Sequence, residues 1–194
     1  ADDVIAYVAQ HDKYKDWDKV IISSDKDFFQ LVEGNCSLYR PIQDTLLEQK
    51  NIMEQYGIHP RNFALARAFE GDKSDNLPGV PRVGLKTIRN RFSFMSSSVQ
   101  HEPEDIFKAC ENAEKPIGVH RNILEHKDIV ESNFKLMQLY SPSISITHKK
   151  QINFALEEFD KSYNKIEILK KMASDGIDAG KFNNLFLSMK KITK

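Results

Sequence analysis

Cysteine is scarce in this 194-residue sequence: there are two, Cys36 and Cys110, far apart and without a CxxC partner. Their scarcity excludes a disulfide scaffold, argues against a structural zinc site and favours a reducing, intracellular setting. Long apolar runs are missing too, since no stretch approaches the roughly 20 apolar residues that a membrane-spanning helix needs. The first residues show no signal-peptide pattern. We therefore expect a cytoplasmic protein without a membrane partner.

The sequence has no net charge, yet its charges are unevenly distributed. It carries 28 acidic and 28 basic residues and is 40% hydrophobic, which is enough apolar content for one compact domain with a smaller appendage. Residues 1–50 hold ten acidic and six basic residues, whereas residues 51–100 hold four acidic and seven basic ones. An acidic segment followed by a basic one is typical of a metal site beside a phosphate-binding surface, although solvated surface charge explains the same counts.

The hydrophobic pattern predicts an α/β arrangement at the start of the chain. Residues 2–8 place apolar side chains on one helical face, and residues 19–24 form a β-branched run typical of a buried parallel strand. A short helix from residue 28 and a strand over 36–40 follow. We expect helices over 51–56, 60–69, 84–91, 104–109, 128–140, 161–173 and 181–192, and an extended segment over 141–154. The predicted organisation is part of an α/β core over 1–48, a helical region over 49–100 and a helical C-terminal region over 101–194.

Three pairs of aspartates stand at the ends of predicted elements. They are Asp2 and Asp3, Asp25 and Asp27, and Asp72 and Asp75. Carboxylates held close together repel one another unless a cation neutralises them, and clusters of oxygen donors suit Mg²⁺ or Mn²⁺. Two such ions about 4 Å apart can activate a water and stabilise the leaving oxygen of a phosphodiester. Simpler alternatives stay open, because helix capping explains the first two pairs and turn hydrogen bonds explain the third.

A glycine-bearing turn joins two predicted helices between residues 77 and 87. Gly79 and Gly84 let backbone N–H groups approach a phosphate closely, and Lys86, Arg89 and Arg91 add positive charge. Such a turn holds a nucleic-acid backbone without reading its bases. A plain helical hairpin with solvated basic residues is the alternative.

The same turn resembles the signature of a nuclease family. The strings GDKSDNLPGV at 71–80 and GLKT at 84–87 resemble the GDxSDNxPGVxxxGxKT signature of 5′→3′ exonucleases and flap endonucleases. This family includes the phage RNase H enzymes and the 5′-nuclease domain of bacterial DNA polymerase I. ISSDKDF at 22–28 resembles the family's SxDxD segment, and ADD at 1–3 resembles the end of its EADD segment. The match is specific up to about residue 95 and loose beyond 100.

The resemblance implies a structure-specific, two-metal 5′-nuclease that hydrolyses DNA flaps, nicked ends or RNA primers on DNA. It implies a PIN-like core and, over 49–100, a helix–three-turn–helix that binds duplex DNA. The expected partners are duplex DNA with a 5′ flap or an RNA–DNA hybrid, and partner replication proteins stay unidentified. It implies that metal ligands, or residues that order metal-bound water, are Asp2, Asp3, Asp25, Asp27, Asp72 and Asp75. It implies DNA contacts by Gly79, Val80, Arg82, Val83, Gly84, Lys86, Thr87 and Arg89, with K⁺ bound at the 79–84 loop.

The sequence departs from the family pattern in two places. Pro81 and Arg82 stand where relatives have a second glycine, which affects the loop geometry and the K⁺ site. The chain also begins after the Glu of EADD, so that we expect it to lack the family's N-terminal third, with its further aspartates and a basic helical arch. Activity then depends on another chain that supplies this part. Two rivals stay open: a non-catalytic duplex-binding fragment, and an unrelated PIN-like ribonuclease, which the 79–87 turn disfavours.

Overall fold

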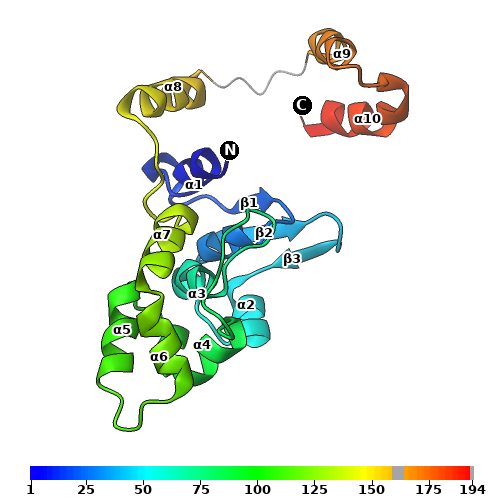
Figure 1. The fold of residues 1–194 in the computed structure, drawn as a ribbon. Helices are drawn as coiled ribbons and strands as arrows, with labels where there is room; N and C mark the ends of the chain where they lie inside the picture. The colour runs from blue at the N-terminus through cyan, green and yellow to red at the C-terminus, as the bar shows by residue number, and fades with distance from the viewer. Residues whose placement is uncertain (159–163, 193–194) are drawn as a thin grey trace. The chain divides into compact units, whose positions relative to one another are not determined.

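A computed structural model describes residues 1–158 and 164–192 of the chain. It divides the chain into two compact units, Ala1–Ile144 and Ser145–Lys194 (Figure 1). The division at residues 48 and 100 stays a prediction. No helix in the described part of the chain is long and apolar enough to cross a membrane.

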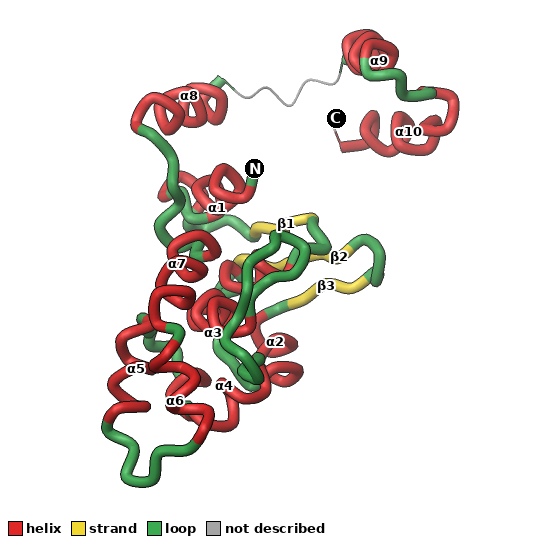
Figure 2. Tube along the Cα trace, viewed as in Figure 1, coloured by secondary structure: helices red, strands yellow, loops and turns green. Residues whose placement is uncertain are grey.

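The first unit contains a three-stranded sheet in the order β1–β2–β3 (Figure 2). β1 (Lys19–Ile22) runs parallel to β2 (Cys36–Arg40), with Ile21 opposite Leu38. β2 runs antiparallel to β3 (Thr45–Leu47). The β-branched residues of β1 favour extended backbone. The parallel pair, with helices packed against it, confirms the predicted α/β class with a partial parallel sheet.

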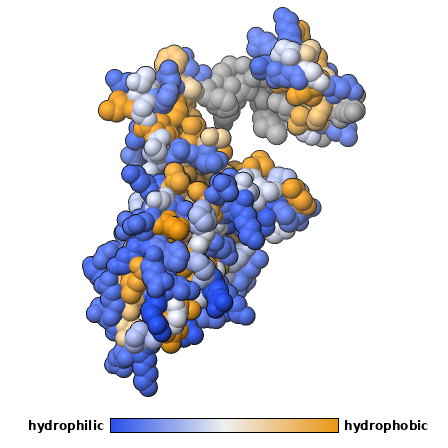
Figure 3. Space-filling model, in the orientation of Figure 1, coloured by the Kyte–Doolittle hydropathy of each residue, from blue (hydrophilic) through white to orange (hydrophobic). Residues whose placement is uncertain are grey.

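β1 is less buried than its apolar sequence predicts. Ile21 is buried, but Val20 is 54% exposed and Ile22 is 70% exposed. These two side chains line a groove between β1 and α1 (Asp2–Ala9), and apolar surface reaches solvent in this unit (Figure 3). The prediction of a buried strand over 19–24 is therefore wrong at alternate positions, because other described residues cover only one face of β1.

The centre of the first unit is α3 (Phe63–Glu70), whose first seven residues are all buried. It packs against α7 (Lys127–Met137). The ring centroid of Phe63 lies 5.1 Å from that of Phe29 and 5.2 Å from that of Tyr56. Burying each such side chain stabilises the fold by roughly 1.5–3 kcal/mol. α3 is therefore a firmly held support for the polar side chains that it carries.

Asn133 of α7 ties three elements together. Its buried side-chain amide donates hydrogen bonds to the carbonyl oxygen of Ala68 in α3, at 3.0 Å, and to that of Pro78 in the following turn, at 2.8 Å. Buried carbonyl groups are costly to leave without a donor. Asn133 thus fixes the turn after α3 against the helical core.

The other helices of the first unit follow the predicted order. They are η1 (Asp12–Tyr14), η2 (Lys26–Leu31), α2 (Gln49–Tyr56), η3 (Pro60–Asn62), α4 (Leu85–Arg91), η4 (Ser93–Ser96), α5 (Pro103–Glu111) and α6 (Gly118–Glu125), where η marks a 3-10 helix. The helices predicted over 51–56, 60–69, 84–91, 104–109 and 128–140 are confirmed, with shifts of a few residues at their ends. η1, η4, α6 and β3 have no counterpart among the predicted elements.

The second unit is helical. It contains α8 (Ile146–Glu157), α9 (Lys165–Ser174), η5 (Ala179–Phe182) and α10 (Asn183–Ile192). The prediction of an extended segment over 141–154 is wrong from Ile146 onward, because Ser145 caps α8: its Oγ accepts a hydrogen bond from the backbone N–H of His148, at 3.2 Å. α9 and α10 confirm the helices predicted over 161–173 and 181–192, and residues 161–163 lie outside the described residues.

The two cysteines are free and buried, Cys36 in β2 and Cys110 in α5. Burial raises the pKa of both thiols, that of Cys110 to about 11. They therefore behave as small apolar core residues with little thiolate at neutral pH.

Candidate functional site

Two of the predicted site aspartates follow β1 directly. Oδ1 of Asp25 accepts a hydrogen bond from the backbone N–H of Asp27, at 2.9 Å. The backbone N–H of Asp25 donates to Oγ of Ser23, at 3.1 Å. Asp25 thus caps η2, as the simpler alternative predicts, while Asp27 lies in the first turn of that helix and is partly buried.

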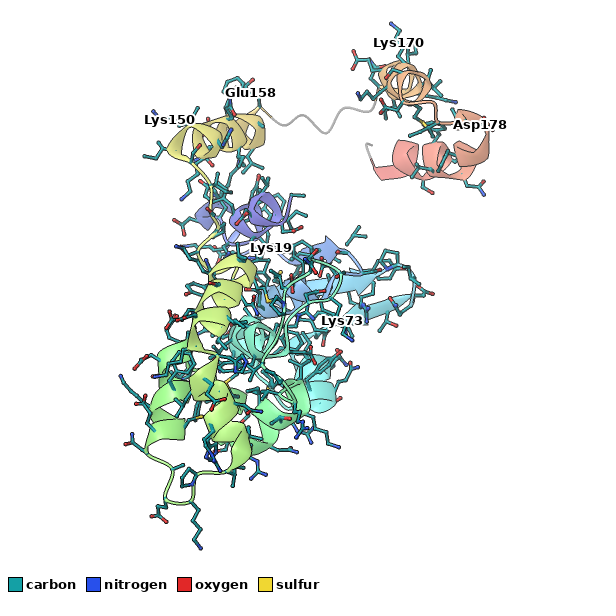
Figure 4. The ribbon with its side chains drawn as sticks, in the orientation of Figure 1. Lys19, Lys73, Lys150, Glu158, Lys170 and Asp178 are labelled. Carbon is teal, nitrogen blue, oxygen red and sulfur yellow. The ribbon has the colours of Figure 1, made fainter. Side chains whose placement is uncertain are left out.

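The third pair lies in the turn between α3 and α4. Asp72 and Leu77 exchange two backbone hydrogen bonds, of 2.9 and 2.7 Å, which close the tip of the turn. Oδ1 of Asp72 accepts hydrogen bonds from the backbone N–H of Ser74, at 2.7 Å, and from the Ser74 hydroxyl. Asp75 is exposed at the tip, as is Lys73 (Figure 4). The turn interactions predicted for Asp72 are present, and its other oxygen, Oδ2, faces a partner outside the turn.

That partner is Arg67 of α3, whose side chain is 8% exposed. Nε and Nη2 of Arg67 donate to Oδ1 of Asp27, at 3.3 and 3.2 Å, and Nη2 also donates to Oδ2 of Asp72. Nη1 lies 3.7 Å from Oε2 of Glu70. We refer to Arg67, Asp27, Asp72 and Glu70 as the Arg67 cluster. It brings two predicted site residues from distant parts of the sequence onto one buried cation.

The two aspartates on this cation have opposite pKa shifts. Burial raises the pKa of Asp27 to about 6; the charges of Asp25 and Asp72 act in the same direction, and Arg67 opposes them. Hydrogen bonds from Ser74, followed by those from Arg67, lower the pKa of Asp72 to about 2. Asp72 is therefore held as a carboxylate, whereas Asp27 is close to its protonation point in mildly acidic solution.

Arg67 is a site residue that sequence reasoning missed. The signal was present, because Arg67 is the single charged residue in the run FALARAF at 63–69. A charge inside a helix that is apolar on all sides needs a buried partner. The pattern identifies a buried cation but not its partners, since Asp27 comes from another segment.

The other predicted metal ligands make different interactions. Asp2 and Asp3 lie in the first turn of α1, and Oδ1 of Asp3 accepts a hydrogen bond from the backbone N–H of Ser143, at 2.8 Å. Over residues 1–158 and 164–192, no three His, Cys, Asp or Glu side chains gather in a way that could hold a metal ion. The convergence of all six aspartates on two ions stays a prediction.

The Arg67 cluster nevertheless has the donor chemistry of a divalent-ion site. Asp27 and Asp72 direct carboxylate oxygens at one cation, and the charge of Asp25 acts on Asp27. Carboxylate oxygens are ligands that Mg²⁺ and Mn²⁺ prefer. The guanidinium of Arg67 supplies the positive charge between these carboxylates, and their oxygens have the donor chemistry that such an ion takes.

The loop after the turn crosses α3 at very close range. Gly71 has a φ of +77°, and a Cβ on Gly79 would overlap the carbonyl oxygen of Glu70. The backbone N–H of Val80 donates to the carbonyl oxygen of Phe69, at 2.8 Å. Only glycine allows the backbone to pass so near the end of α3.

Arg82 has a φ of +64°, the left-handed conformation that glycine favours. Arg82 therefore holds a backbone conformation that a glycine would adopt at less steric cost.

We refer to residues 79–91 as the basic segment. Its cationic side chains are all exposed, whereas Val80, Val83 and Ile88 are buried beneath them. These cations are Arg82, Lys86, Arg89 and Arg91. Of the predicted DNA-contacting residues, Val80 and Val83 therefore have only their backbone available. Oε1 of Glu70 accepts a hydrogen bond from the backbone N–H of Leu85, at 3.4 Å, which connects the Arg67 cluster to the start of α4.

Comparison with known proteins identifies the family. Residues 1–57 match the profile described as 5′-3′ exonuclease, N-terminal resolvase-like domain. Over 141 residues the chain is 33% identical to the 5′-3′ exonuclease of Aquifex aeolicus, which covers 73% of this chain and 45% of that protein. Over 139 residues it is 32% identical to the thermostable DNA polymerase I of Thermus aquaticus, which covers 72% of this chain and 16% of that protein. The chain belongs to the 5′-3′ exonuclease family.

This exonuclease-family chain spans less than half the length of the curated exonucleases that it matches. Its match to the 5′-3′ exonuclease of Buchnera aphidicola subsp. Schizaphis graminum, at 40% identity over 87 residues, covers 45% of this chain and 30% of that protein.

Solved structures confirm the fold. A T5 5′-exonuclease mutant has a TM-score of 0.67 and 20% sequence identity, covering 81% of this chain and 65% of that one. The bacteriophage T5 D15 flap endonuclease, solved as a pseudo-enzyme-product complex with DNA and metal ions, has a TM-score of 0.58 and 18% identity, covering 90% of this chain and 57% of that one. At such identities the similarity shows the fold alone, which is the α/β nuclease fold that the resemblance implies.

Proposed function

We propose that this chain contributes the acidic site and the duplex-binding turn of a structure-specific 5′-nuclease. The enzyme hydrolyses phosphodiester bonds of DNA flaps, nicked ends or RNA primers on DNA. The observation that carries the proposal is the Arg67 cluster. It brings Asp27, which follows β1, and Asp72, which follows α3, onto one cation beside the basic segment in a chain of this family. The bacteriophage T5 relative solved with DNA and metal ions supports the same classes of ligand.

The proposed metal ligands come from all three aspartate pairs. Asp25, Asp27, Asp72 and Asp75 hold one Mg²⁺ or Mn²⁺, and Asp2 or Asp3 contributes to a second ion. When bound, such ions activate water and stabilise the leaving oxygen. The contribution of the chain is to orient the carboxylates: Ser74 keeps Asp72 ionised, and η2 presents Asp27 beside it.

The basic segment holds the duplex backbone in this proposal. Arg82, Lys86 and Arg89 are exposed and attract phosphates, and Thr87 follows Lys86 in α4. The backbone of residues 79–84, with Gly79 and Gly84, approaches the duplex, and its carbonyl groups bind K⁺. The buried side chains of Val80 and Val83 keep this loop in place.

Cleavage of a 5′-flap substrate tests the catalytic assignment. We expect the complete protein to cleave the flap in Mg²⁺ or Mn²⁺ and not in EDTA, and we expect Asp25→Asn in that protein to reduce the rate at least about 100-fold. Asp16→Asn is the matched control, because Asp16 is exposed and precedes the opposite end of β1. Cleavage by Asp25→Asn at the rate of the control would remove the catalytic role of this aspartate.

Duplex binding tests the basic segment separately. We expect Lys86→Ala to weaken binding at low salt and to reduce the slope of log K against log salt by about one, since one phosphate contact is lost. Lys150→Ala in the second unit, also an exposed lysine (Figure 4), is the control. An unchanged slope in Lys86→Ala would contradict the phosphate contact.

A second candidate is a non-catalytic duplex-binding protein. Two observations favour it. Arg67 forms ion pairs with both Asp27 and Asp72, and no three His, Cys, Asp or Glu side chains in the described residues gather in a way that could hold a metal ion. The cleavage assay separates the two candidates, because this one predicts duplex binding without metal-dependent hydrolysis.

A further inference from the structure

Arg67 stands out as a buried cation that faces more negative charge than it can neutralise. Its guanidinium contacts the carboxylates of Asp27, Asp72 and Glu70. One positive charge is thus shared among three acidic side chains. Without a cation between them, Asp27 and Asp72 would face each other across a poorly solvated space and repel.

The contacts with these three partners are not equal. Asp27 and Asp72 accept hydrogen bonds from the guanidinium, whereas Glu70 is 3.7 Å away and its side chain is 35% exposed. Asp27 and Asp72 come from η2 and from the turn after α3, and Glu70 is three residues from Arg67 on α3 itself. Arg67 and Glu70 can therefore stay paired even when the other two contacts break.

We propose that Arg67 is a positioning residue: it is a resident cation that holds Asp27 and Asp72 together until a divalent ion displaces it toward Glu70. This inference rests on the metal site of the proposed function. A divalent ion held by Oδ1 of Asp27 and Oδ2 of Asp72 would compete with the guanidinium for these oxygens and would repel it. Arg67 thus keeps the site assembled when it is empty, and it weakens ion binding in doing so.

Mn²⁺ binding without DNA provides the test, since it needs no catalysis. The full chain and its Arg67→Met variant are titrated with Mn²⁺, and free Mn²⁺ is measured by electron paramagnetic resonance. We expect Arg67→Met to bind Mn²⁺ about tenfold more tightly, because the competing charge is gone. We also expect its metal-free melting temperature to be lower and Mn²⁺ to raise that temperature more than in the unaltered protein.

Arg61→Met is the matched control. Arg61 lies in η3, just before α3, and forms an ion pair with Glu33, with Nε of Arg61 2.7 Å from Oε2 of Glu33. Losing this pair does not change the charge at Asp27 and Asp72, so we expect an unchanged Mn²⁺ affinity. Arg67→Lys keeps a positive charge but cannot bridge two carboxylates as a guanidinium does. We therefore expect its Mn²⁺ affinity to lie between that of the unaltered protein and that of Arg67→Met.

The outcomes distinguish this role from a purely structural one. A structural arginine would lower stability when removed and would leave Mn²⁺ binding unchanged or weaker, and that result would overturn the proposal. If Arg67→Met does not fold, the comparison is made with Arg67→Lys, for which an affinity equal to that of the unaltered protein overturns it. If the unaltered protein and the folded Arg67 variants all fail to bind Mn²⁺, the metal site of the proposed function is itself overturned.

Discussion

The Arg67 cluster and the basic segment carry opposite charges and are built in opposite ways. In the cluster, the charged side chains are themselves part of the packing: Arg67 is buried and its partners Asp27 and Asp72 are hydrogen-bonded. In the basic segment, the cations are exposed and the structure beneath them is held by glycine backbone and buried valines. The comparison shows that the acidic residues are built into the packed structure, whereas the basic residues are separable from the fold.

Among the substitutions that test this comparison, Gly79→Ala has the largest expected effect on the free energy of unfolding. A Cβ at residue 79 would overlap the carbonyl oxygen of Glu70, so α3 and the loop have to separate. We expect the free energy of unfolding to fall by about 3 kcal/mol or more. Urea denaturation followed by the fluorescence of Trp17, the single tryptophan, measures this change.

Gly118→Ala is the control for this substitution. Gly118 begins α6, and a Cβ there would meet nothing within 4 Å. We expect a change within about 1 kcal/mol. Equal effects at both positions would mean that the basic segment does not depend on the close crossing at Gly79.

The pH dependence of stability sharpens the acidic side of the comparison. The folded-state pKa of Asp27, about 6, lies above its ordinary value of 3.8. Between pH 4 and 6 the unfolded chain therefore releases a proton that the folded protein keeps, and the stability of the metal-free protein falls as pH rises, by up to about 2–3 kcal/mol. Unfolding in EDTA at several pH values measures the decline, and Asp27→Asn should abolish it.

Asp72→Asn is the informative counterpart. The lowered pKa of Asp72, about 2, contributes stability that is present above pH 4 and is lost as pH falls toward 2. In Asp72→Asn, the free energy of unfolding should no longer fall as pH drops from 4 toward 2. It should still fall as pH rises from 4 to 6. A decline that persists in Asp27→Asn would assign it to another group.

Arg82→Gly has the smallest expected effect and tests the basic side. Arg82 adopts a φ of +64°, which glycine reaches without the steric cost that an L-residue bears. We expect Arg82→Gly to raise the free energy of unfolding by up to about 1 kcal/mol and to weaken duplex binding, because a cation is lost. Urea denaturation and a duplex titration measure the two effects.

Arg89→Gly, inside α4, removes a cation in the same segment. It should instead lower the free energy of unfolding by about 1 kcal/mol, since glycine is a poor helix former. Loss of stability in both variants would contradict the separation of fold and charge in the basic segment.

Local features of the sequence predict local structure well in this chain. The strand over 36–40 has the observed bounds, and Asp2 and Asp3 mark the start of α1. The Asp25 cap and the turn around Asp72 follow from side chains that reach only two residues along the chain. Because such interactions join residues close together in the sequence, residue spacing is enough to predict them.

Features that depend on distant partners are harder to predict. The meeting of Asp27 and Asp72 on Arg67 joins three segments, and no spacing rule contains it. The apolar run of β1 indicates a strand, but it does not indicate which face of the strand other residues cover. The exposure of Val20 and Ile22 could therefore not be predicted from the sequence. The alternation of Ile144 and Ile146 is too short to distinguish a strand from the start of the helix that Ser145 caps.

The burial of both native thiols makes this chain convenient for site-selective chemistry. Cys36 and Cys110 are enclosed and their pKa values are raised, so maleimide or iodoacetamide reagents should react with them slowly. A cysteine introduced by Lys73→Cys, at the exposed tip next to Asp72, would then be the preferred point of attachment without removal of either native thiol. A fluorophore or spin label placed there would lie next to Asp72 of the Arg67 cluster and would report on changes in that cluster.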